Sequence, residues 1–407
     1  MRILIFILIS FLFSQSSVLS FGGFGSPRSY QNPINAGAGQ IELFSTSSGA
    51  GSSSALASIW KSNFTNLNIS NQFQKLNSSN YEDIFSNGID LLSISFPIKG
   101  NRALQISIHP QYWTQYSINE LNNPQIVEFD GMNYSYKSHY YGRGGFSNLG
   151  LSWSQKLNDI FSFGIGLNNY FGNKFQSDST FSYNISLNSE GEEVLTPNSL
   201  SITNSTHHYQ GYGIRADLIS KLDKYKLGLS FKTIGPFTID QKKYFSTGLS
   251  QSAIIKKRYN FLNYQAIFGI KYEKSPNLGF ITELKYKRWK TLDESFLILK
   301  TQNYNENQFS MGTYYHSINQ STGFFQSFTL RGGVYYKLLE NLELDFIIND
   351  YGITFGTGFK YNNNANSINL SFVLGNREMD IYEIKNEKYI DIILGIEVGE
   401  KWFIRKK

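Results

Sequence analysis

Apolar and polar residues alternate along much of the chain. Between Tyr225 and Thr233, one set of alternate positions is mainly apolar and the other polar or glycine: Tyr225, Leu227, Leu229 and Phe231 against Lys226, Gly228, Ser230 and Lys232. Successive side chains of a β-strand point to opposite faces, so this pattern predicts a strand with one apolar face. The same alternation recurs at Phe161, Phe163, Ile165 and Leu167, at Leu262, Tyr264, Ala266, Phe268 and Ile270, and at Ile390, Ile392, Leu394, Ile396 and Val398.

The number of these segments favours a transmembrane barrel over a soluble sandwich. Their second faces carry charged residues and glycine, which suit a wet barrel interior. We therefore predict an all-β fold, a transmembrane antiparallel β-barrel of about 14 strands, whose even count returns both termini to one side. The candidate strands begin near Leu67, Gly88, Arg102, Gly145, Ile160, Thr206, Tyr225, Tyr259, Leu278, Phe324, Asn341, Gly352, Asn366 and Tyr389.

The predicted connections alternate between short and long. Tight turns follow even-numbered strands at Lys99-Gly100-Asn101, Asn158-Asp159, Asp223-Lys224, Ser275-Pro276-Asn277, Leu339-Glu340-Asn341 and Asn362-Asn363-Asn364. Most odd-numbered strands precede long polar connections, namely Asn119 to Gly144, Gly172 to Ser205 and Lys300 to Gly323, with a short exception at Asp350 and Tyr351. Short periplasmic turns and long outer loops are typical of bacterial outer-membrane barrels.

The amino terminus predicts export. Residues Met1 to Ser20 contain Arg2, an apolar stretch from Ile3 to Phe13 and then small and polar residues, as in a secretory signal peptide cleaved after Ser20 or Ser16. No later apolar run approaches the about 20 residues of a spanning helix. We expect a signal peptide over residues 1–20, an amino-terminal segment that folds inside the barrel over 21–66, and the barrel over 67–407.

The amino-acid composition fits an outer-membrane barrel but does not by itself exclude a soluble β protein. The 27 Tyr and 33 Phe residues suit aromatic girdles at the two membrane interfaces, although a soluble lectin-like β protein is also rich in aromatic residues. The chain has no cysteine, which excludes lipoprotein processing and disulfides. Its net charge of +6, which becomes +5 when Arg2 leaves with the signal peptide, is spread along the strands and does not favour nucleic-acid binding.

The alternation assigns many charged side chains to the lumen. They are Arg215, Lys226, Lys232, Lys271, Lys285, Lys287, Arg331, Lys337 and Lys360 against Asp217, Glu283, Glu343, Asp345, Asp391 and Glu397. One explanation is that these charges pair with one another and fill the barrel. The other is that a somewhat basic lumen attracts an anionic solute.

No motif for catalysis or metal binding is present. The five histidines, His109, His139, His207, His208 and His316, lack metal-ligand spacing, and there is no Gly-x-Ser-x-Gly elbow or phosphate-binding loop. We expect no enzymatic activity, no metal and no cofactor. An outer-membrane hydrolase would need a Ser-His pair that the sequence does not mark.

Pro110 is the most informative single residue. The alternation through Ile106 and Ile108 points Pro110 toward lipid and His109 toward the lumen. Proline cannot donate to a strand ladder, so a central strand must bulge or part at this position. The alternative is that the strand merely ends or bends toward an outer loop there.

Four stretches resemble the FadL/TodX family of outer-membrane transporters for hydrophobic compounds. The run Ala36-Gly37-Ala38-Gly39 and the stretch from Ser54 to Leu67 are similar to the start of that family's plug. The stretches from Gly142 to Trp153 and from Phe161 to Gly172 are similar to its fourth and fifth strands. The resemblance identifies plug residues as Trp60, Asn63, Phe64 and Leu67.

The resemblance implies passive uptake of hydrophobic solutes, such as long-chain fatty acids or hydrocarbons, across the bacterial outer membrane. A kink in the third strand would open sideways into the membrane, and Pro110 lies in the matching strand. The implied ligand-binding residues are His109, Pro110, Tyr112, Trp113, Phe324 and Phe325, although such aromatics, like Tyr116, Tyr140 and Tyr141, also suit an interfacial girdle.

The expected partners are membrane lipid, hydrophobic small molecules and, during biogenesis, the outer-membrane assembly machinery. We expect a monomer that does not bind nucleic acid. The main alternative is a non-transporting barrel that acts as a secretion-system or assembly partner through its long loops.

Overall fold

The computed structural model describes residues 26–27, 32–46, 55–78, 81–99, 101–119, 125–129, 132–187, 193–247, 253–292, 304–318, 327–341, 346–362, 365–381 and 384–401. The predicted signal peptide lies outside these residues. In the described chain, 14 strands form a closed antiparallel barrel, which confirms the predicted fold class. They are β2 (Thr65–Ser78), β3 (Tyr81–Ile98), β4 (Arg102–Asn119), β6 (Met132–Lys156), β7 (Phe161–Leu187), β8 (Glu193–Leu222), β9 (Tyr225–Thr247), β10 (Ala253–Ser275), β11 (Leu278–Thr291), β12 (Tyr304–Ile318), β13 (Ser327–Asn341), β14 (Phe346–Tyr361), β15 (Asn366–Ile381) and β16 (Ile384–Glu400).

The barrel closes because its first and last strands pair. β16 lies antiparallel to β2, from Glu400 opposite Thr65 to Glu387 opposite Ser78. The other neighbours follow chain order, with β4 next to β6. Two short strands are not part of the ring: β1 (Ser26–Pro27) pairs with β4, and β5 (Gln125–Phe129) pairs with β6. Because the barrel is closed, backbone N–H and C=O groups within the membrane can hydrogen-bond to a neighbouring strand. The hydrocarbon core contains no water that could bond to them instead.

The predicted alternation is present on the barrel wall. On β9, Leu229 and Phe231 are exposed on the outside while Ser230 between them is buried. On β10, Phe268 is exposed and the neighbouring Ile267 is buried against the lumen segment described below. An apolar outer face around a largely polar interior is what a lipid-embedded barrel needs.

Tight turns lie at several of the predicted positions. The turns at Asn101, Asp223 and Asn362 each use a residue with a left-handed backbone, with φ of 56°, 52° and 52°. Asn and Asp adopt this conformation more readily than other side chains because they can hydrogen-bond locally. The sequence therefore identified these turns correctly.

The predicted strands between residues 300 and 361 were partly wrong. β12 runs through the stretch from Lys300 to Gly323, which was expected to be an outer loop. Asp350 and Tyr351, expected in a short outer connection, lie inside β14, and Leu339-Glu340-Asn341, expected as a tight turn, lies in β13. One strand was missed and another was split in two, so the two errors cancel in the count of 14.

β12 was missed because its apolar alternation is weak. Its outward positions begin with Asn305 and Asn307, and only then continue with Phe309 and Met311. Pairing with β13 over its whole length, and with β11 from Tyr304 to Tyr315, compensates for that weak local signal.

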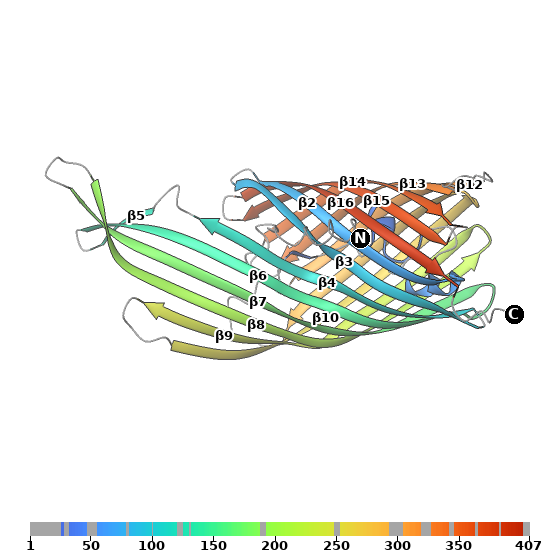
Figure 1. Ribbon diagram of the computed structural model, residues 1–407, viewed down its shortest axis with the longest axis horizontal. Coiled ribbons are helices and arrows are strands. Elements are labelled where there is room, and N and C mark those ends of the chain that lie inside the picture. The colour runs from blue at the N-terminus through green and yellow to red at the C-terminus, as the bar shows by residue number, and fades with distance from the viewer. Residues whose placement is uncertain are drawn as a thin grey trace.

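One side of the barrel is much taller than the other. β6 to β10 contain 25, 27, 30, 23 and 23 residues, whereas the remaining barrel strands contain 14 to 18. Figure 1 shows these long strands projecting beyond the rest of the ring. The predicted loops from Asn119 to Gly144 and from Gly172 to Ser205 are therefore mainly strand, because the ladder between β6, β7 and β8 continues beyond the barrel.

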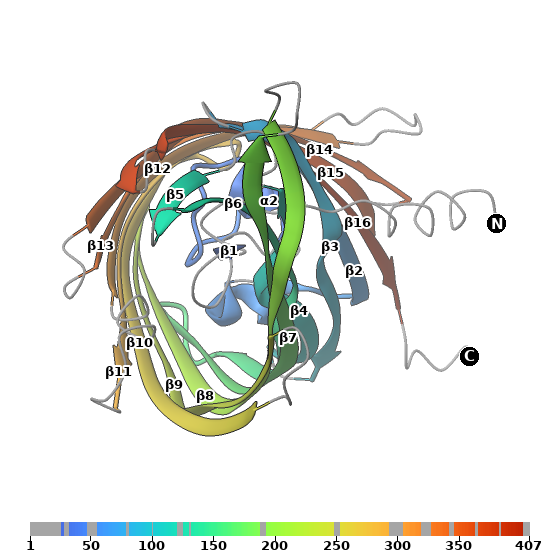
Figure 2. The ribbon, with the colours of Figure 1, turned by 90° about the vertical axis from the view of Figure 1, so that its left-hand side faces the viewer.

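An amino-terminal segment lies inside the ring. It comprises residues 32–46, with the short helix α2 (Pro33–Ala36), and residues 55–62, with the 3-10 helix η2 (Leu56–Lys61). We call these two stretches the lumen segment. Figure 2, viewed along the barrel, shows it surrounded by strands. Ala38, Ile41 and Leu43 are fully buried and pack against Ile267 and Ile281 of the wall.

Candidate functional site

β3 and β4 pair over only part of their length. Their ladder runs from Ile98 opposite Arg102 to Leu92 opposite Ile108 and then stops. Beyond it, residues 81–91 of β3 pair with β2, and residues 109–119 of β4 pair with β6. In the described chain only β1 pairs with this part of β4 on its other edge, at Tyr112 and Trp113. We call the separated stretches, residues 81–91 and 109–119, the β3–β4 seam.

Local sequence explains where the ladder stops. Ile108 is the last residue of β4 that pairs with β3. Pro110 follows it two residues later and has no N–H to donate. The register between β4 and β6 shifts between Pro110 and Tyr112. Opposite the shift, Gly145 has φ of 155°, and a Cβ at this residue would lie 2.1 Å from the carbonyl oxygen of Tyr112. A proline on one strand and a glycine on the next therefore permit a kink.

The kinked part of β4 reaches across the lumen. His109 is buried and hydrogen-bonds Gln111, whose Oε1 accepts from Lys232 of β9 at 3.3 Å. The Tyr112 hydroxyl accepts from Lys287 Nζ at 3.0 Å and from Trp289 Nε1 at 3.1 Å, both on β11, and it hydrogen-bonds Tyr304 of β12. His109 thus faces inward as predicted, and these contacts join β4 to the far side of the ring.

Aromatic side chains fill the lumen beside the seam. Tyr112 stacks on Phe146 with ring centroids 5.1 Å apart, Phe146 lies 4.9 Å from Phe237, and Phe237 lies 5.6 Å from Trp289. The buried group, which we call the aromatic cluster, comprises Tyr112, Phe146, Tyr170, Tyr209, Ile234, Phe237, Ile239, Tyr259, Phe261 and Trp289.

Of the aromatic cluster, sequence reasoning singled out only Tyr112. The alternation did contain a signal for Phe261, which occupies an inward position of a strand whose outward positions Leu262 and Tyr264 are also apolar or aromatic. Where both faces of a strand are apolar, the sequence pattern does not show which face meets lipid. An apolar site on the inward face is then not recognised from sequence.

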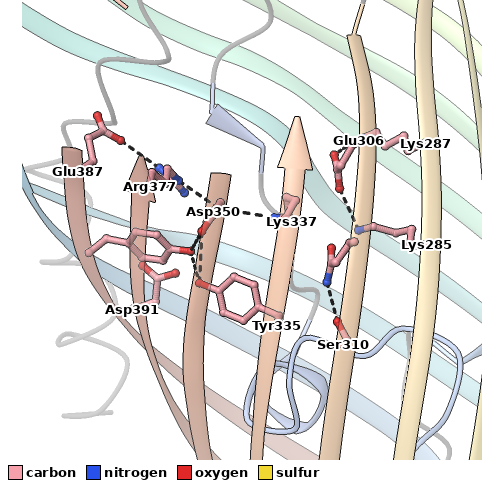
Figure 3. Close-up of polar contacts among 12 residues, drawn as sticks. Lys285, Lys287, Glu306, Ser310, Tyr335, Lys337, Asp350, Arg377, Glu387 and Asp391 are labelled. Atoms are coloured by element: carbon pink, nitrogen blue, oxygen red, sulfur yellow. Dashed lines mark hydrogen bonds and ion pairs between the residues drawn. The ribbon is translucent and has the colours of Figure 1, made fainter. Parts of the chain in front are cut away.

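Charged side chains form a layer inside the wall from β11 to β16 (Figure 3). Glu306 lies 3.2 Å from Lys285 and 3.4 Å from Lys287. On β15, Arg377 Nε lies 3.2 Å from Asp350 of β14, and its Nη1 lies 3.3 Å from Glu387 of β16. Among the described residues, the predicted lumen charges do face inward, and many pair with one another, which favours the structural explanation. Glu343 and Asp345 lie outside the described residues.

The lumen segment is bound to the wall by polar contacts. The Glu283 carboxylate of β11 accepts three backbone N–H groups, from Glu42 at 2.7 Å, Leu43 at 2.9 Å and Phe44 at 3.3 Å. Glu42 in turn forms an ion pair with Lys285 at 2.9 Å. Burial alone would raise the pKa of the Glu42 carboxyl, but nearby cations, chiefly Lys285, outweigh burial and lower it to about 2.

A second part of the lumen segment, η2, approaches β6 and β8. The backbone N–H of Leu56 donates to Asp217 at 3.2 Å, and that of Trp60 donates to Ser154 at 3.3 Å. A Cβ at Gly164 of β7 would lie 2.6 Å from the carbonyl carbon of Leu56, so the wall comes closest where it carries glycine. These contacts fix the position of η2 against the inner wall.

The other predicted site residues are dispersed. Trp113 is half-buried and lies opposite Gly145 of β6 and Ser26 of β1. Asn63 is exposed and Phe64 half-buried between η2 and β2. Leu67 lies in β2 with an exposed side chain, so it belongs to the barrel wall. Phe324 and Phe325 lie outside the described residues.

The described residues contain no group of three or more His, Asp or Glu side chains placed to hold a metal ion. The histidines hydrogen-bond neighbouring polar groups: His207 contacts Gln241, and His316 contacts Thr329. Of the helices in the described ranges, none is long and apolar enough to cross a membrane.

Comparison with known proteins identifies the fold. The model of the BamG family matches residues 1–407, whereas no curated protein matches the chain. The P. putida toluene transporter TodX is 12% identical with a TM-score of 0.55, over 92% of this chain and 99% of that chain. A Pseudomonas aeruginosa FadL homologue is 12% identical with a TM-score of 0.56, over the same shares. The CymD monoaromatic hydrocarbon channel is 12% identical with a TM-score of 0.55, over 91% and 97%.

Proposed function

The chain belongs to the BamG family and is a barrel of the bacterial outer membrane with the fold of the FadL/TodX channels, and from this premise we propose that it takes up hydrophobic solutes passively. A solute is captured at the tall extracellular wall, enters the lumen beside the lumen segment and leaves sideways through the β3–β4 seam. The barrel works as a monomer once the outer-membrane assembly machinery has inserted it.

The interrupted ladder between β3 and β4 carries the proposal. Elsewhere round the ring, neighbouring strands pair along most of their shared length, but here pairing stops at Leu92 and Ile108. An open sheet edge at membrane depth is costly, and irregular backbone there is tolerated where it lines a cavity or is covered by protein. A passage for solutes between β3 and β4 explains why their ladder is interrupted.

The aromatic cluster supports an apolar substrate. Ligand sites are lined mainly by apolar and aromatic side chains with a few polar groups that fix orientation. Tyr112 supplies both, since its ring stacks on Phe146 and its hydroxyl accepts from Lys287 and Trp289. The rings pack against each other, so a solute must displace some of them, which makes the aromatic cluster a gate beside the seam.

A lateral route also suits the chemistry of the solute. The lumen from β11 to β16 is lined by charged side chains such as Lys285, Glu306 and Arg377, many of them paired. Transfer of an apolar solute through this charged layer would expose it to a polar environment, whereas exit through the wall delivers it to lipid directly. Long-chain fatty acids and hydrocarbons are the substrate classes that this route favours.

Uptake of a radiolabelled long-chain fatty acid and of radiolabelled toluene tests the proposal. Cells lacking the barrel are compared with cells that make the wild type, Pro110→Val or Pro197→Val at equal surface levels. Pro197 is a matched control because it also lies at a register shift, between β7 and β8, but beyond the ring. We expect uptake by the wild type and Pro197→Val, and loss in Pro110→Val. Wild-type uptake no higher than in cells lacking the barrel would exclude transport of these solutes.

The second candidate is a non-transporting barrel that acts as an assembly or secretion partner. Two observations favour it: the buried rings of the aromatic cluster pack against one another in the lumen near Tyr112, and the tall hairpins β6 to β9 offer a large surface (Figure 1). This role predicts that deleting residues 178–203, which include the end of β7 and the start of β8, reduces the surface levels of other outer-membrane proteins while solute uptake is unaffected.

A further inference from the structure

Basic side chains gather on the outer face of the tall wall. We propose that this face binds the phosphate groups of an anionic lipid in the outer leaflet of the membrane. The residues, called the basic belt below, are Lys242 of β9, Lys256 and Arg258 of β10, and Arg288 and Lys290 of β11.

The basic belt lies on the same face as the lipid-facing residues. On β11, Arg288 and Lys290 continue the outward series of Leu284 and Tyr286, and they lie opposite Tyr264 and Leu262 of β10. On β10, the two residues between Arg258 and Leu262 that would point the other way, Tyr259 and Phe261, are buried in the aromatic cluster. Alternation therefore directs Arg258 and Lys256 outward.

An aromatic girdle joins the basic belt to the lipid-facing band. Tyr264 and Tyr286 lie with ring centroids 6.1 Å apart, and Arg288 lies directly opposite Tyr264 in the β10–β11 ladder. Tyrosines concentrate at the level of lipid headgroups, where an apolar ring meets a polar region. Arg288 thus marks the headgroup level, and the other cations lie at or beyond it toward the extracellular end.

Within the part of the chain that the structure describes, the charges of the basic belt are not balanced. Lys242 lies directly opposite Lys256 in the β9–β10 ladder, and like charges in this arrangement repel each other. Arg258 pairs with Asp240 at 2.6 Å, and this is the one ion pair that the basic belt forms in the described part of the chain. Five cations therefore share one carboxylate, and Lys242, Lys256 and Lys290 are exposed.

The opposite wall shows that this excess is local. Among the side chains that the structure describes near its extracellular edge, the outward charges are Glu340 of β13, Glu378 of β15, Lys388 of β16 and Lys75 of β2, which sum to zero. There the girdle residue Tyr351 donates to the acidic Glu378 at 2.6 Å, whereas on the basic belt the girdle residue Tyr264 lies opposite Arg288. One sector of the rim is thus suited to anions, and its continuity with the lipid-facing band favours a lipid phosphate.

The test measures binding of diphosphoryl lipid A to the purified full-length barrel by native mass spectrometry. The belt variant carries Lys242→Gln, Lys256→Gln, Arg288→Gln and Lys290→Gln. The control variant removes the same number of cations elsewhere, by Lys221→Gln, Lys224→Gln, Lys274→Gln and Lys388→Gln, all of which are exposed. Heat-modifiable migration on a gel verifies that each variant is folded.

We expect the apparent affinity for the lipid to fall by about tenfold or more in the belt variant, because each basic residue near an anionic surface contributes to binding, and to change little in the control. An unchanged affinity in the belt variant, or an equal fall in both variants, would overturn the proposal. Complete displacement of the lipid by millimolar inorganic phosphate would also overturn it, since the site would then recognise free phosphate. Persistence of the lipid in that arm supports a membrane ligand.

Discussion

The Glu283 carboxylate is expected to decide whether residues 42–44 of the lumen segment stay attached to the wall. It accepts backbone N–H groups from Glu42, Leu43 and Phe44 at 2.7 to 3.3 Å. The substitution Glu283→Ala removes all three acceptor contacts and leaves three N–H groups at the wall without a partner. Glu283→Gln retains one carbonyl oxygen, and should therefore have an intermediate effect.

The magnitude follows from the number of bonds. A hydrogen bond to a charged group contributes about 1.5–3 kcal/mol, so three bonds have a gross value of about 4.5–9 kcal/mol. Water that enters the lumen and replaces part of these contacts reduces the loss, and we expect about 2–4 kcal/mol for Glu283→Ala. Since about 1.4 kcal/mol corresponds to a factor of ten, local opening of residues 42–44 should become about thirtyfold to several hundredfold more frequent.

Hydrogen exchange of the purified barrel, read out by mass spectrometry on peptides that cover residues 38–46, measures this opening. The expected order of exchange rates is Glu283→Ala, then Glu283→Gln, then wild type, while peptides from β13 to β16 remain unchanged. Exchange in Glu283→Ala within about threefold of the wild type, which corresponds to less than 1 kcal/mol, would refute the claim that this carboxylate holds the segment.

Three further predictions concern the wall and the lumen. Arg377→Met leaves two buried carboxylates of the charged layer without their guanidinium, and should lower the free energy of unfolding by about 3–5 kcal/mol in a urea titration in lipid vesicles. Phe268→Arg places a charge on the lipid-facing side and should cost about 2–4 kcal/mol in the same titration if the residue lies at the bilayer midplane; a cost near zero would contradict the assigned face. Because the pKa of Glu42 is lowered to about 2, its pairing with Lys285 contributes fully above the ordinary carboxyl pKa and is lost as the pH falls from about 4.5 to 2. Exchange of residues 42–44, corrected for its intrinsic pH dependence, should rise over that range in the wild type and stay level in Glu42→Gln.

Much of the barrel could be predicted because a period of two is a strong signal where one face meets lipid. It identified strands such as β9, whose outward positions Leu227, Leu229 and Phe231 alternate with Gly228 and Ser230. It failed where outward residues are polar, as at the start of β12, and where strands continue beyond the membrane, as in β7 and β8. In both cases the ladder with neighbouring strands, a non-local contact, determines the structure.

The candidate site, too, could be predicted from the sequence only in part. Pro110 could be recognised because a missing N–H is a property of the residue itself, and its neighbour Ile108 does end the ladder with β3. The aromatic cluster could not be assembled from sequence, because its rings come from strands spread between β4 and β11 and meet only after closure. Contacts such as Tyr112 with Trp289 depend on how far the kinked strand reaches across the lumen.

The seam bears on the choice between transport and a purely structural role. A fully paired third strand would be the more stable solution, because unsatisfied backbone groups at membrane depth cost several kcal/mol each. The chain forgoes pairing with β3 over residues 109–119 of β4, where among the described residues only β1 pairs with that edge, and it places Pro110 and Gly145 at the kink. Departures from regular structure that a fold maintains at a cost concentrate at functional sites. A partner that only presents its outer hairpins needs no such departure in its wall, whereas a channel with a lateral exit does, and on this ground the transport role is the stronger of the two candidates.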